Sequence, residues 1–250
     1  MKKIILTTLI SCTASLFTAL GSQAQDVIVM QKGPSRSGEI LGFAGDKIRL
    51  QVGQGGQQVT TSIPIAQVKS ITKSAPDSFT KALASWKNND AKATIAALNP
   101  LFEKFNGLPT PWAERIGPLL ADASIAAGNA DAAAGILQKF EAAYPEAANV
   151  SNLTKAKIAV SKKDYGAAKS ILAPIVAQGA QTKLADSGQS IAFGQAFYLM
   201  AQIHEQEGAY PEAVQDYLRT ATIFFEDQTT ADKAQARANE LIAEKNVVVP

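Results

Sequence analysis

Apolar side chains change their spacing once along this chain, near residue 75. Within 47–52 every second residue is apolar, which predicts a strand with one buried face. Within 79–86 apolar residues stand three and four positions apart, which is typical of a helix. The chain is therefore expected to contain a β domain at residues 26–73 and an all-α domain at residues 76–250, an α+β multidomain fold.

The β domain is expected to be a small barrel. Its short apolar runs are separated by turns that begin at Gly33, Gly45 and Gly53, so fewer than fifty residues hold four or five strands. That is too little chain for a sandwich, whereas a small curled barrel needs no more. The order of glycines and apolar residues from Val27 to Ile71 resembles the Sm-like and SH3-like small barrels. The resemblance implies a closing one-turn helix just before the last strand.

The helical region carries start and stop signals at regular intervals. Capping residues and prolines predict helices that begin at or near Asp77, Asp90, Thr110-Pro111, Asp131, residue 151, Asp164, residue 190, Pro211 and residue 230. Pro100 and Pro174 fall inside two of these helices, 74 positions apart, and are expected to kink them.

Small residues recur at matching places in successive helix pairs. Thr94, Ala133, Ala168 and Ala213 lie 39, 35 and 45 positions apart, and Ala121, Ala156 and Ala201 keep a fixed offset from the last three. This pattern resembles the tetratricopeptide (TPR) repeat, whose period is about 34 residues. The resemblance implies about four helix pairs and a C-terminal capping helix, stacked closely through these small positions. A plain helical array without TPR geometry is the alternative.

Residues 1–24 have the pattern of a secretory signal peptide. Lys2 and Lys3 precede an apolar run that ends at Leu20, and Ser22 and Ala24 suit cleavage before Gln25. A periplasmic or secreted protein without a transmembrane segment after cleavage is expected. The alternatives are an uncleaved anchor and a lipoprotein attached through Cys12, although that cysteine comes early for a lipobox.

Composition argues against several kinds of chemistry. Without Lys2 and Lys3, the 24 basic residues fall to 22 and equal the 22 acidic ones, so the chain lacks the positive field that nucleic-acid binding needs. Cys12 and His204 are the only cysteine and histidine. We therefore expect no catalytic residues, no metal site and no cofactor.

The TPR resemblance also implies where a partner binds. The first helix of each pair would line a concave groove, into which Tyr198, Gln202 and Glu205 would project, with Asp122 as a weaker equivalent. The alternative for Tyr198 is that it covers a neighbouring helix. Trp86 is expected at a contact with the barrel or with the next helix, and the alternative is an exposed anchor for a partner.

Together these features predict an exported, non-catalytic protein–protein interaction module of the bacterial cell envelope, which binds a protein or peptide. One alternative is a structural or assembly component that oligomerises through the small barrel. A less favoured alternative is a polysaccharide hydrolase whose carboxylates converge only in three dimensions.

Overall fold

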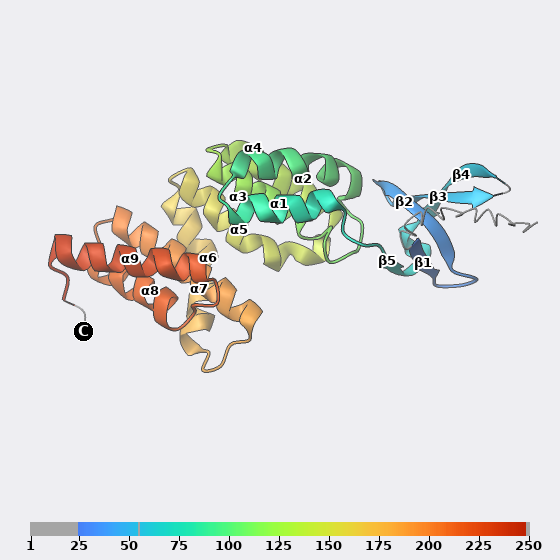
Figure 1. Cartoon of the computed structure of the whole chain (residues 1–250). Helices are drawn as coiled ribbons and strands as arrows, with labels where there is room; N and C mark the ends of the chain where they lie inside the picture. The colour runs from blue at the N-terminus through green and yellow to red at the C-terminus, as the bar shows by residue number, and fades with distance from the viewer. Residues whose placement is uncertain (1–24, 55, 249–250) are drawn as a thin grey trace, which may run out of the picture.

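The computed structural model describes residues 25–54 and 56–248, and the predicted signal peptide lies outside them. Five strands come first and nine α-helices follow within the described residues, which confirms the α+β class. Figure 1 shows the sheet at one end of the row of helices. The strands are β1 (Asp26–Met30), β2 (Arg36–Ala44), β3 (Lys47–Gln54), β4 (Gln57–Pro64) and β5 (Val68–Thr72), with a short 3-10 helix at Ile65–Gln67 before β5.

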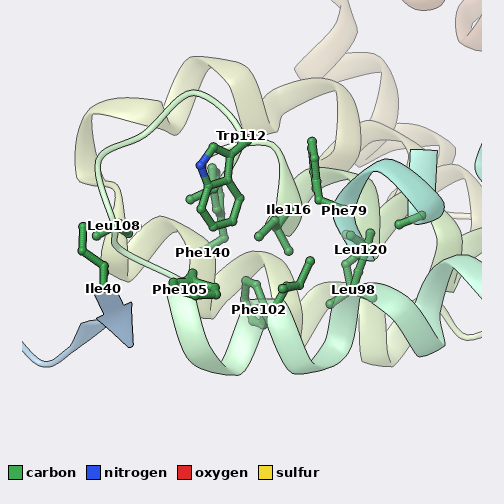
Figure 2. Close-up of a cluster of buried hydrophobic side chains, with 14 of the residues drawn as sticks. Ile40, Phe79, Leu98, Phe102, Phe105, Leu108, Trp112, Ile116, Leu120 and Phe140 are labelled. Carbon is green, nitrogen blue, oxygen red and sulfur yellow. The ribbon is translucent and has the colours of Figure 1, made fainter. Parts of the chain in front are cut away.

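The sheet is open, so the predicted closed barrel is wrong. Its strand order is β4-β3-β2-β1-β5, all antiparallel, and β4 and β5 form its two edges in the described part of the chain. A sheet closes when its own strands must cover its apolar face. Here the helices cover part of that face, because Ile40 of β2 belongs to the same buried cluster as Phe105 and Leu108. Figure 2 shows these three side chains together.

The sheet and the first helices meet closely. A Cβ on Gly42 would lie 2.8 Å from the backbone oxygen of Lys104, so only glycine fits there. The indole N–H of Trp112 donates to the backbone oxygen of Lys73, just after β5, at 3.0 Å. This tryptophan, and not Trp86, reaches the β domain.

The helices form four sequential pairs and a final single helix. Their bounds are α1 (Asp77–Lys87), α2 (Ala91–Phe105), α3 (Ile116–Ala126), α4 (Ala130–Ala143), α5 (Ala148–Ser161), α6 (Tyr165–Gln181), α7 (Ser187–Gln206), α8 (Tyr210–Thr222) and α9 (Gln228–Lys245), with a 3-10 helix at Pro145–Ala147. Each helix packs on the next, and α3, α5, α7 and α9 also contact one another in succession. The pairs therefore stack as an array.

One predicted helix start is wrong. Thr110-Pro111 opens a series of turns, and α3 begins only at Ile116. In these turns Glu114 N–H bonds to the Thr110 oxygen, while the buried ring of Trp112 holds the segment against the sheet. Tertiary packing of this side chain thus overrides the local helix signal.

The four turns within the helix pairs share one geometry. Each has a residue in the left-handed conformation, at Asn89, Gly128, Lys163 and Gly208. In every case the next residue's N–H bonds back to the carbonyl five positions earlier, at 2.8 or 2.9 Å. Such an end lets the chain reverse at once into the following helix.

The predicted small positions are fully buried. Ala82, Ala121, Ala156 and Ala201 on the first helices have no exposed surface, and neither have Thr94, Ala133, Ala168 and Ala213 on the second helices. The prediction that these side chains lie at close helix contacts is confirmed. The long spacing between the last two units is taken up by α6 and α7, which have 17 and 20 residues.

Candidate functional site

Two adjoining hollows run along the first helices of the pairs. One, of about 630 Å³, is lined in part by Tyr198, Gln202 and Glu205, and the other, of about 770 Å³, by Asp122. Both are also lined by Val160, Ser161, Tyr198, Gln202 and Lys233. We call the two hollows together the helical groove. The structure thus brings all four sequence-predicted residues to one continuous depression.

A simple positional rule describes most of this lining. Residues four and five positions after the buried alanine line the groove on α1, α3, α5 and α7, and residues one position after it do so on α3, α5 and α7. These offsets select one face of a helix, beside the row of alanines. The residues are Trp86, Lys87, Asp122, Ile125, Ala126, Lys157, Val160, Ser161, Gln202, Glu205 and Gln206.

Asp122 is tied to the neighbouring repeat. Its Oδ2 accepts a hydrogen bond from Lys157 Nζ on α5 at 2.7 Å, and both side chains are largely buried. Its Oδ1 is also buried and accepts no hydrogen bond in the described part of the chain. Asp122 therefore links α3 to α5 within the groove lining. A bound partner would contact the Asp122–Lys157 ion pair and not a free carboxylate.

Glu205 is held in a similar way near the other end of the groove. Arg237 on α9 donates to both of its oxygens, from Nε at 3.1 and 3.2 Å and from a terminal nitrogen at 2.5 Å, and the Tyr217 hydroxyl adds a bond of 3.0 Å. Hydrogen bonding to Arg237 lowers the pKa of Glu205, although partial burial opposes this. Glu205 is thus an ionised carboxylate that connects α7, α8 and α9.

Tyr198 combines the two roles considered for it. Its ring packs edge-on against Tyr217, with 5.5 Å between ring centroids, so part of it covers the neighbouring helix. The ring is nevertheless only partly buried and lines both hollows. Burial, reinforced by the charge of Glu205, raises the pKa of Tyr198, so its hydroxyl stays protonated and available as a donor at neutral pH.

The two ends of the groove differ in chemistry. Near α1 and α3 the lining includes the apolar side chains of Trp86 and Ile125, together with Leu199 from α7, whereas near α9 it includes the charged side chains of Arg237 and Glu240. Lys87 and Lys233 line it too, are exposed, and make no ion pair within the described residues. An elongated ligand with an apolar part and a negative part fits this distribution.

Several residues of the groove were missed from the sequence. Lys157 and Arg237 escape notice because each lies over thirty positions from its carboxylate partner, Asp122 or Glu205. For Trp86 the sequence favours a packing contact over the alternative of an exposed anchor, and the structure places it in the groove lining. The offset from the buried alanines would have found Trp86 and Lys157, since they occupy the same faces as Glu205 and Asp122.

The partly buried His204 lies beside a buried carboxylate outside the groove. Its Nδ1 lies 3.2 Å from Asp216 Oδ2 without hydrogen-bond alignment, and Arg219 donates to Oδ1 of the same carboxylate at 3.1 Å. Burial raises the pKa of Asp216, opposed by the nearby His204 and Arg219. These three side chains hold α7 against α8, and none of them lines the helical groove.

Comparisons with protein-family models, with curated proteins and with solved structures gave no match to this chain. Within the described residues, no helix has the length and apolar character that spanning a membrane requires.

Proposed function

We propose that this protein is an exported, non-catalytic adaptor of the cell envelope, whose TPR-like array binds a partner peptide in the helical groove. The observation that carries the proposal is the row of buried alanines with a lined groove beside it. Close stacking through small residues is what allows helix pairs to form a continuous curved surface, and such surfaces hold extended peptides or helices.

The lining favours a particular kind of peptide. A large apolar side chain would bury itself against Trp86 and Ile125, and acidic side chains would face Lys87 and Lys233. The Tyr198 hydroxyl and the Gln202 amide lie where the two hollows adjoin and would supply hydrogen bonds to the middle of the peptide. An aromatic side chain with polar neighbours is a frequent energetic centre of an interface.

The state of the carboxylates supports a binding role over hydrolysis. Glycoside hydrolysis needs a protonated acid and a second carboxylate on opposite sides of one bond. In the groove, Glu205 and Glu240 both bind Arg237, and the pKa of Glu205 is lowered, so it is not an acid that holds a proton at neutral pH. The hydrolase alternative finds no support in this pair.

A steric block of the groove tests the proposal. Ser161 is exposed and lines both hollows, so Ser161→Trp should fill the groove without touching the core. We expect a displayed peptide library to yield apolar and acidic sequences, and Ser161→Trp to weaken their binding at least tenfold by fluorescence anisotropy. Gln138→Trp, on an exposed face of α4 outside the groove, is the matched control and should bind normally. Equal binding by both variants would refute the groove.

Export is tested independently. If residues 1–24 are a signal peptide, the mass of the protein recovered from the envelope fraction should correspond to a chain that begins at Gln25. A chain that begins at Cys12 with attached lipid would establish the lipoprotein alternative, and an intact Met1 in that fraction would establish the uncleaved anchor. Recovery of the protein only from the cytoplasmic fraction would contradict export.

A further inference from the structure

Strand β4 presents an open row of backbone hydrogen-bonding groups. Just beyond the strand, Ile65 N–H donates to the Asp46 oxygen at 2.8 Å. Because inward and outward pairs alternate along an antiparallel ladder, every second residue of β4 bonds to β3 and the others point outward. The outward residues are Gln58, Thr60, Ser62 and Pro64, and only the last lacks an N–H to donate.

This edge lacks the features that usually block further strand pairing. β4 carries no charged residue, has no proline before its last position, and keeps an unbroken register with β3 over eight residues. Residues 57–62 are exposed, and Figure 1 shows β4 on the part of the sheet remote from the helices. At the other edge, β5 has only five residues, includes Lys69, and meets a register shift at Val29/Met30.

We propose that two copies of this chain pair through β4 about a two-fold axis, which joins their sheets. A two-fold axis places the two copies of β4 side by side in opposite directions, so a charge near the middle of the strand would lie close to the same charge of the second copy. β4 has none. Side chains that lie on one face of the sheet must lie on the same face in the second copy. Only registers that place residues of one face opposite residues of that same face are therefore allowed.

One such register matches the apolar residues as well. With Thr61 opposite Thr61 of the second copy, Val59 lies opposite Ile63, and Thr60 lies opposite Ser62. Val59 is 43% exposed in the single chain, and this pairing covers it. The outward N–H and C=O groups of Thr60 and Ser62 then bond across the axis. Threonine pairs and β-branched apolar pairs are favourable neighbours across antiparallel strands.

The first test removes an outward donor. Thr60→Pro deletes an N–H that faces away from β3, so the hairpin is retained while the interface loses bonds. Light scattering should show the full-length protein at twice the mass of one chain and the variant at the mass of one chain. Should Thr60→Pro lose its circular dichroism spectrum, Thr60→Lys serves instead, since it adds a charge to the edge. A wild-type protein that is monomeric across a wide concentration series overturns the proposal.

The second test fixes the register. In a Cys12→Ser background, Thr61→Cys supplies the only thiol of the chain. Mild oxidation should link two copies through position 61, whereas Ser70→Cys on β5 should stay unlinked. Linking that occurs only in a mixture of the two variants would place β4 against β5 of another copy and overturn the two-fold arrangement. Both tests are independent of peptide binding in the groove.

Discussion

The two halves of this molecule bury their apolar side chains in different ways. In the N-terminal half the sheet and α1 to α4 share a single buried cluster of mostly large apolar side chains. In the C-terminal half the buried apolar residues fall into three smaller clusters, and charged groups lie between the helices. The comparison teaches that one repeat architecture can be built on a single continuous apolar core at one end and on several smaller clusters, with hydrogen-bonded ions between helices, at the other.

The largest expected effect lies in the shared apolar cluster. Phe140 is 1% exposed, and its ring packs directly over Gly117, which leaves no room for another side chain there. Phe140→Ala should lower the free energy of unfolding by about 3–5 kcal/mol, since it creates a cavity among side chains that cannot collapse. Urea denaturation followed by circular dichroism measures this change. The control Phe225→Ala removes a ring that is 52% exposed and should change the free energy by less than about 0.5 kcal/mol.

A smaller effect is expected from the ionic network of the C-terminal half. Glu205→Gln keeps the shape of the side chain but removes the charge that binds Arg237 and Tyr217. Allowing for the partial exposure of this pair, the loss should be about 1–2 kcal/mol. Hydrogen exchange should show it in α7 to α9 and not in the sheet. Equal loss of protection in both halves would contradict the division.

The same variant predicts a change in pH dependence. Because the pKa of Glu205 is lowered in the folded protein, its contribution is complete above the ordinary glutamate pKa and is lost as pH falls through the lowered value. The pKa of Asp216 is raised by burial, so its cost to the folded state is relieved as pH falls through that raised value, in the wild type and in Glu205→Gln alike. Below about pH 4.5, wild-type protein should therefore lose more stability than Glu205→Gln. Melting temperatures measured from neutral to acid pH check this, and parallel curves would contradict it.

The turns between paired helices offer a matched set of still smaller changes. Asn89 and Lys163 adopt positive φ without being glycine, whereas Gly128 and Gly208 hold the same position in the other pairs. Gly128→Ala and Gly208→Ala should each cost about 1 kcal/mol, although no atom within 4 Å would touch the added methyl. Asn89→Gly and Lys163→Gly should be neutral or stabilising. Thermal unfolding compares all four, and a loss in Asn89→Gly and Lys163→Gly as large as in the two alanine variants would contradict the left-handed conformation as the cause.

The smallest effect is expected from a surface ion pair. Lys139 and Glu103 lie 3.4 Å apart with side chains that are mostly exposed. Glu103→Gln should change the free energy of unfolding by less than about 0.5 kcal/mol. Calorimetry at low and at high salt measures it, and a large salt-dependent loss would mean that surface charge also stabilises the N-terminal half.

Much of the fold followed from local patterns. The change of period near residue 75 separated sheet from helices, and Asp90 and Asp164 cap α2 and α6 as predicted, each accepting a backbone hydrogen bond. Asp77 falls inside the first turn of α1, after Pro76. These signals work because they act over a few residues, within which the backbone has few choices.

What the sequence missed depends on contacts between distant segments. Nothing local indicates that the apolar face of the sheet packs beside Phe105 and Leu108, which removes the need for a closed barrel. Nothing local links Trp112 with Lys73 either. For the groove, the TPR resemblance implied the positions of Tyr198 and Gln202, whereas the binding of Asp122 and Glu205 to cations on other helices emerged only from the folded arrangement.

The junction between sheet and array has a mechanical consequence. Only residues 73–76 connect β5 to α1. The Asp26–Lys73 ion pair joins β1 to the first residue of this connection, and Trp112 donates a hydrogen bond to the same residue from the helical side. Because this connection is short and β2 packs against α2, a force applied to β4 would be transmitted through β2 to α2. The orientation of whatever the sheet attaches to would then dictate the direction in which the array extends.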